Sequence, residues 1–127
     1  LGRDEALIID MEAGIEHFGR ATADAVDAFI VVVEPGQRSI RTLMSIKKLA
    51  EDIGVYRIFV VGNKIRGDED RCFIQEACGD IPVMGYLSYN QKLVEIDRQE
   101  LTPFGNCSKY TDEVKLIKLA IERQLIK

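Results

Sequence analysis

Residues 28–34 read Ala-Phe-Ile-Val-Val-Val-Glu and are followed at once by Pro35-Gly36. A continuous β-branched stretch of this length is typical of a strand buried on both faces, and Pro-Gly ends it. Apolar residues then recur at helical spacing from Ile40 to Ile53, and residues 55–61 form a second apolar strand pattern. Buried strands joined by an amphipathic helix predict a parallel α/β sheet.

The same alternation extends on both sides of this stretch. We expect further strands at residues 6–10 and 83–87, and helices over residues 15–26, 69–77, 91–98 and 109–126. Ser39 is expected to cap the helix that ends at Gly54. The sequence therefore predicts an α/β fold in a single domain over residues 1–127, with a mostly parallel sheet covered by helices on both faces.

Length and composition agree with one globular domain. The chain has 127 residues, of which 46% are hydrophobic and 30% charged, which is enough apolar material for a core. A net charge of −4 argues against nonspecific nucleic-acid binding. No apolar stretch approaches the roughly 20 residues of a membrane span, and no signal peptide is visible. Three cysteines without a CxxC pair suit a reducing compartment, so we expect a cytoplasmic location.

Asp10 and Gly14 are the first candidates for chemistry. In open α/β sheets, ligands bind beyond the carboxyl ends of the strands, and Asp10 ends the expected strand at residues 6–10. In a nucleotide triphosphatase, an Asp at this place orients Mg²⁺ and a nearby Gly lets the backbone approach the γ-phosphate. The alternative is an Asp that caps the next helix. Spacing alone leaves both interpretations open.

Asn63 and Lys64 follow the apolar residues 55–61 and are placed to bind a base. The Asn amide can match an adenine edge, and the Lys stem can cover a ring face. The alternative is a turn, because Gly-Asn is a common turn pair. A metal-ligand role for His17 has no second ligand at a suitable spacing, so a surface or partner-facing His is favoured. The sequence contains no GxxxxGK[ST] phosphate-binding loop.

The stretch Ile8–Arg20 reads Ile-Ile-Asp-Met-Glu-Ala-Gly-Ile-Glu-His-Phe-Gly-Arg. It resembles the switch II region of the CooC-type ATPases, which are carbon monoxide dehydrogenase accessory (nickel-insertion) proteins among the MinD/ParA-like P-loop ATPases. The resemblance continues through Glu34-Pro35, Asn63-Lys64 and residues 86–98. Ser88 and Asn90 depart from it, because the family usually has Pro and Asp there.

This resemblance implies a role for each matching residue. Asp10 and Gly14 would be catalytic, with Asp10 holding Mg²⁺ through water and Gly14 sensing the γ-phosphate. Asn63 would read adenine in a base pocket lined by Lys64, Ser88, Tyr89 and Asn90. The switch residues that would transmit the nucleotide state to the dimer interface or the client are Glu12, Glu16, His17 and Arg20.

The family's Walker A loop and its metal-binding CxC pair lie upstream of the strand that ends at Asp10. We therefore expect this chain to be the C-terminal portion of a P-loop ATPase domain that lacks the P-loop strand and has no nickel site. Loss of that strand would expose strand edges, which would re-pair or form an edge-to-edge dimer.

The resemblance implies an activity for the intact protein. It would be a homodimeric metallochaperone-type ATPase that uses ATP/ADP and Mg²⁺ to insert nickel into carbon monoxide dehydrogenase or a related nickel enzyme. The chain alone is expected to be inactive. The alternatives are a nucleotide-free protein-interaction module and a MinD/ParA-like positioning ATPase fragment. Membrane binding through the last helix is disfavoured, because Glu113 and Glu122 interrupt its basic face.

Overall fold

The computed structural model describes residues 5–11 and 24–125, and their centre is a parallel β-sheet. Its strands, β1 (Phe29–Val33), β2 (Ile58–Ile65) and β3 (Val83–Ser88), lie side by side in chain order. Helices follow each strand, and their bounds are α2 (Gln37–Ile53), α3 (Asp68–Cys78), α4 (Gln91–Arg98) and α5 (Ser108–Leu125). The predicted α/β class and parallel strand pairing are confirmed.

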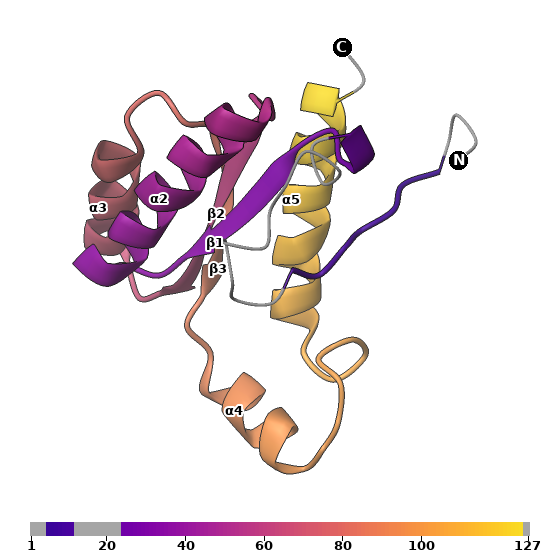
Figure 1. Cartoon of the computed structure of the whole chain (residues 1–127). Helices are drawn as coiled ribbons and strands as arrows, with labels where there is room; N and C mark the ends of the chain where they lie inside the picture. The colour runs from indigo at the N-terminus through magenta and orange to yellow at the C-terminus, as the bar shows by residue number, and fades with distance from the viewer. Residues whose placement is uncertain (1–4, 12–23, 126–127) are drawn as a thin grey trace.

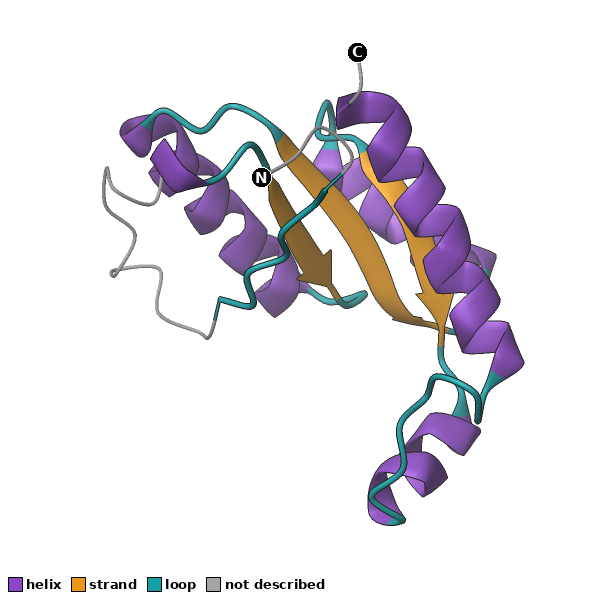
Figure 2. Cartoon of the chain, turned by 90° about the vertical axis from the view of Figure 1, so that its right-hand side faces the viewer, coloured by secondary structure: helices purple, strands orange, loops and turns teal. Residues whose placement is uncertain are grey.

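Helices cover both faces of the sheet (Figures 1 and 2). Helices α2 and α3 lie together on one face, while α5 packs against β3 on the other. Helix α4 stands away from the sheet, below the end where β3 leaves it (Figure 1). The expected arrangement of helices on both faces is therefore confirmed. Helix α4 is the exception, because it covers neither face of the sheet.

The core lies between the sheet and the α2–α3 layer. Its most deeply buried large side chains are Leu43 from α2, Ile74 from α3, and Val33 and Val60 from the sheet. Truncation of any of them to Ala would leave a cavity. For the Leu or the Ile, the free energy of unfolding would fall by about 2–5 kcal/mol. This packing fixes the positions at which the strands end, and therefore the position of anything built on those ends.

Strand β1 differs from its prediction, because only one of its faces is buried. Phe29, Val31 and Val33 point into the core, whereas Ile30 and Val32 are 46% and 58% exposed. Strand β2, by contrast, is buried continuously from Ile58 to Gly62. Helix α5 reaches over β3 rather than over β1, which leaves the outer face of β1 open among the described residues.

The strand expected at residues 6–10 is also a wrong prediction. Residues 5–11 run as an extended segment without strand pairing, and Leu7, Ile8 and Ile9 are exposed. An apolar segment becomes a strand only where a neighbour offers its backbone groups, and β1 pairs only with β2 among the described residues. Re-pairing of these two segments is therefore not seen here, and the edge-to-edge dimer stays a prediction.

Several predicted boundaries shift. The second strand begins at Ile58 rather than at residue 55, because Gly54, in the left-handed conformation, ends α2 and the Val55 N–H bonds back to the carbonyl of Ala50. Gly36, not Ser39, is the N-cap of α2. Of the helix expected over residues 15–26, only its last turn is described, and Asp24 and Ala25 are helical.

Within residues 5–11 and 24–125, no helix is both long enough and apolar enough to cross a membrane.

Candidate functional site

Asn63 and Lys64 occupy a β-bulge near the carboxyl end of β2. Gly62 pairs with Tyr86 and Ile65 pairs with Ser88, so these two residues face the single residue Leu87 on β3. Lys64 has φ 56°, in the left-handed region that non-glycine residues rarely adopt. A bulge of this kind redirects side chains out of the regular alternation and is common beside functional sites. The two candidates thus lie within a strand, rather than after it as predicted.

Gly62 serves close packing rather than a turn. A Cβ placed on Gly62 would lie 2.6 Å from Cδ1 of Tyr86 and 3.1 Å from Cδ1 of Ile74. The Gly-Asn pair is therefore not a turn here, and the alternative interpretation from the sequence is not supported. The glycine lets the Tyr86 ring lie against β2 directly before the bulge.

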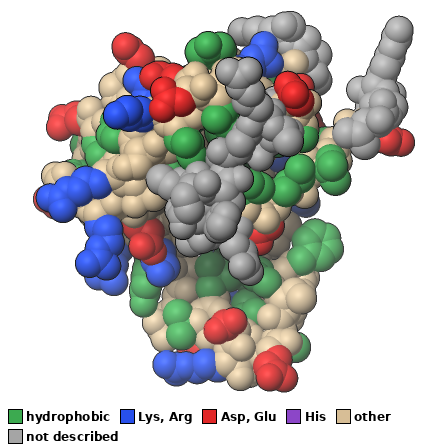
Figure 3. Space-filling view, in the orientation of Figure 1, with side chains coloured by type: hydrophobic (Ala, Val, Ile, Leu, Met, Phe, Trp, Pro, Cys, Tyr) green, Lys and Arg blue, Asp and Glu red, His purple; other side chains and the backbone are tan. Residues whose placement is uncertain are grey.

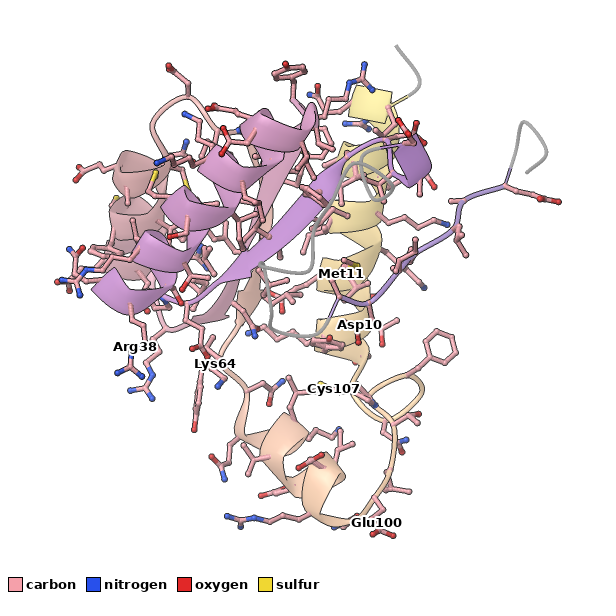
Figure 4. The ribbon with its side chains drawn as sticks, viewed as in Figure 1. Asp10, Met11, Arg38, Lys64, Glu100 and Cys107 are labelled. Atoms are coloured by element: carbon pink, nitrogen blue, oxygen red, sulfur yellow. The ribbon has the colours of Figure 1, made fainter. Side chains whose placement is uncertain are left out.

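Glu34 joins the bulge to the end of β1. Its Oε1 lies 2.7 Å from Nζ of Lys64, and its backbone N–H donates to the hydroxyl of Ser39 in the first turn of α2. The hydrogen bond to Glu34 and its negative charge raise the pKa of Lys64. Figure 4 shows Lys64 and Arg38 at the same end of the sheet, and Figure 3 shows Lys and Arg side chains gathered there beside α2.

Tyr89 and Arg66 form a second feature at this end of the sheet. The guanidinium of Arg66 lies 4.6 Å from the centre of the Tyr89 ring, a cation–π distance. The Tyr89 N–H donates to the carbonyl of Ile65, its hydroxyl bonds Oε1 of Gln91, and the ring remains 41% exposed. An aromatic ring held at both ends yet still exposed is a platform on which a planar group can stack.

Ser88 and Asn90 have structural partners. The backbone N–H and the hydroxyl of Ser88 donate to the two carboxylate oxygens of Glu113 on α5, at 3.1 and 2.7 Å. Asn90 caps α4 through its Oδ1, which accepts from the Lys92 N–H, and its amide nitrogen donates to Sγ of Cys107. These bonds use the hydroxyl hydrogen of Ser88 and about half of the hydrogen-bonding capacity of the Asn90 amide. The base-pocket role of both residues stays a prediction.

Asp10 is exposed and lies in the extended segment of residues 5–11. In the view of Figure 4 it lies toward the same end of the molecule as Lys64. A single carboxylate suits Mg²⁺ held partly by water and phosphate, which is how this ion is usually bound. The other switch candidates, Glu12, Gly14, Glu16, His17 and Arg20, lie outside the described residues. Across the part of the chain that is described, no three His, Cys, Asp or Glu side chains gather as a metal site.

Glu34, Arg66 and Glu113 were not among the predicted site residues, although Glu34 and Arg66 lie just after apolar stretches, where ligands of open α/β sheets bind. Each acts through a residue on another element, and Ser88 and Glu113 are 25 positions apart. Nothing in the local sequence around Glu113 indicated its contact with Ser88.

None of the known protein-family models matches the chain. It is 34% identical over 119 residues to the carbon monoxide dehydrogenase accessory protein CooC of Rhodospirillum rubrum, covering 94% of this chain. It is 42% identical over 98 residues to an uncharacterized ATP-binding protein of Methanocaldococcus jannaschii, covering 75% of this chain. Over most of its length the chain is therefore related to CooC and to this ATP-binding protein.

The fold is similar to that of one solved structure. It matches the MinD cell division protein of Aquifex aeolicus with a TM-score of 0.67 over 89% of this chain and 49% of that one, at 20% identity. The chain spans 45% of the length of the Rhodospirillum relative and 38% of the Methanocaldococcus relative. These 127 residues therefore correspond to less than half of either relative.

Proposed function

We propose that this chain supplies the base-binding part of an ATP site in a MinD/ParA-type ATPase. The observation that carries the proposal is the bulge at Asn63 and Lys64, which redirects an amide and a cationic stem at the carboxyl end of a buried strand. Ligands of open α/β sheets bind at this end. The names of several relatives describe ATP-binding proteins, which fits a purine base at this place.

Each residue of the proposed base site has a chemical task. The Asn63 amide offers a donor and an acceptor, which can pair with the edge of adenine. The exposed ring of Tyr89, backed by Arg66, offers a stacking surface, and the methylenes of Lys64 offer an apolar wall. Ser88 and Asn90 would line the pocket. Ser88 is held there by its hydrogen bond to Glu113, and Asn90 by its capping bond to α4.

The phosphates would be held by other parts of a longer protein. The sequence has no GxxxxGK[ST] loop, and positioning the phosphates is nearly all of phosphoryl-transfer catalysis. Asp10 would contribute to Mg²⁺ binding, and Gly14 to recognition of the γ-phosphate. We therefore propose that the 127-residue chain alone does not hydrolyse ATP. Mg²⁺-dependent hydrolysis by the pure chain that is lost in Asp10→Ala would contradict this.

We further propose that the longer protein works in nickel insertion into carbon monoxide dehydrogenase, as a cytoplasmic homodimer. The support is the 34% identity to a carbon monoxide dehydrogenase accessory protein over 94% of this chain. Glu12, Glu16, His17 and Arg20 would then report the nucleotide state to the partner subunit or the client enzyme. Nickel would be cargo, held outside this chain.

The test is a titration of the chain with a fluorescent adenine nucleotide. We expect weak binding to the unmodified chain, and a loss of roughly fivefold to fiftyfold in affinity in Tyr89→Leu, because one base–aromatic stack is removed. Tyr56→Leu is the matched control, because Tyr56 is an exposed tyrosine that follows α2, before β2 begins. Asn63→Ala tests the base edge and should bind guanine and adenine nucleotides equally.

Two results would count against the base site. One is an absence of nucleotide binding by a chain whose far-UV circular dichroism shows the folded α/β content. The other is equal loss of affinity in Tyr89→Leu and Tyr56→Leu. The first outcome would favour the alternative of a nucleotide-free interaction module.

A further inference from the structure

We propose that Glu34 determines which end of a nucleotide this site accepts. By pairing with Lys64, it lets the site take an uncharged base and reject phosphate. The inference rests on the nucleotide-binding function proposed above and adds a specificity-determining residue to it.

The pairing of Glu34 with Lys64 is set by the backbone of both residues. Val33 pairs with Gly62 in the β1–β2 register, so Glu34 leaves β1 as the bulge leaves the regular path of β2. Glu34 is held by its N–H bond to Ser39, and Lys64 by its left-handed conformation inside the bulge. The 2.7 Å contact between Oε1 and Nζ is therefore built into the strand ends.

The surroundings of Lys64 explain why a carboxylate is needed here. Arg38 lies at the same end of the sheet in the view of Figure 4, and Arg66 stacks on Tyr89. The first turn of α2 contains no acidic residue. With Lys64 uncompensated, this edge would combine a helix N-terminus with several cations, which is the arrangement that attracts phosphate.

Glu34 changes that balance in two ways. Its carboxylate occupies the Lys64 ammonium with a charge-assisted hydrogen bond, so a phosphate would have to displace it. Its own negative charge also repels phosphate from the end of β1. The methylene stem of Lys64, held in place by its paired head, remains available to the flat face of a base.

The experiment compares two ligands that represent the two ends of ATP. Adenosine and inorganic pyrophosphate are titrated separately into the unmodified chain, Glu34→Gln and a control, with amide chemical shifts as the readout. The control is Glu122→Gln, because Glu122 is also a partly exposed Glu in an ion pair, with Lys118 at 3.7 Å. The variants are checked for the same far-UV circular dichroism.

The expected result is a change of preference in one variant only. Glu34→Gln should bind pyrophosphate roughly fivefold more tightly and adenosine several-fold more weakly than the unmodified chain, with the pyrophosphate gain shrinking as salt rises. Glu122→Gln should behave as the unmodified chain. Equal behaviour of Glu34→Gln and Glu122→Gln toward both ligands would overturn the proposal.

Failure of the proposed function would look different. If the unmodified chain binds no adenosine, base binding fails, yet a gain of pyrophosphate binding in Glu34→Gln would still support the exclusion of phosphate by Glu34. Amine labelling gives a ligand-free check, because Lys64 should react faster once its partner is removed. An unchanged labelling rate at Lys64 in Glu34→Gln would overturn the pairing itself.

Discussion

The substitution Gly85→Ala tests how α5 is held on the sheet. A Cβ on Gly85 would lie 2.6 Å from Cγ1 of Ile117, 3.5 Å from its Cδ1 and 3.8 Å from its Cβ. Carbon atoms in van der Waals contact are separated by about 3.5–4.0 Å, so Ile117 or the helix would have to retreat by roughly 1 Å. Ile117 is the buried residue of α5, which leaves it little room to move.

The expected cost follows from two opposing effects. Overpacking a tight contact costs about 1–3 kcal/mol, whereas replacing a strand Gly by Ala returns about 0.5–1 kcal/mol of backbone entropy. We therefore expect Gly85→Ala to lower the free energy of unfolding by roughly 1–2 kcal/mol. The chain has no Trp, so urea denaturation is best followed by far-UV circular dichroism.

A double-mutant cycle shows whether the contact itself is responsible. Ile117→Ala alone should cost about 2–4 kcal/mol through the cavity it leaves. In the double variant the methyl group added by Gly85→Ala enters that cavity, so the combined cost should be smaller than the sum of the two single costs by about 1 kcal/mol. Strictly additive costs, or a stabilising Gly85→Ala, would refute the close approach of β3 and α5.

Three further predictions concern Glu113 and the cysteines. Glu113→Gln should lower the free energy of unfolding by about 1–2 kcal/mol, because the amide can accept only one of the two hydrogen bonds from Ser88; thermal denaturation against Glu122→Gln measures this, and equal melting temperatures would contradict it. With a thiol reagent at neutral pH, Cys72 should react much faster than Cys78, because Cys72 is exposed and burial raises the pKa of Cys78. For the same reason, stability should fall as the pH rises above the ordinary thiol pKa of about 8.5, since the unfolded chain ionises Cys78 first; a flat stability from about pH 8 to 10 would argue against this.

The regular elements could be predicted because each rests on a local pattern. The apolar residues of β2 and the helical spacing in α2 both identify elements that the structure contains, and α4 has the predicted bounds. A local pattern shows that a side is apolar but does not show whether anything covers it. For that reason the exposed face of β1 and the unpaired residues 5–11 were not foreseen.

The base-site residues stay a prediction, and their geometry could not be derived from the sequence. The bulge at Asn63 and Lys64 arises from the register between β2 and β3, which no single segment encodes. The partners Glu34 and Glu113 come from other elements of the chain. The contacts therefore come from pairs of elements that no single stretch of sequence specifies.

The order of the strands has a consequence for how the chain folds. Because β1, β2 and β3 pair in the order of the sequence, the sheet of the described residues can grow by one strand–helix–strand unit at a time. Helix α5 then closes on the most recently added strand, through contacts such as Ser88 with Glu113. Short sequence separations between contacting residues favour fast folding, so refolding should be quicker than in an all-β domain of similar length.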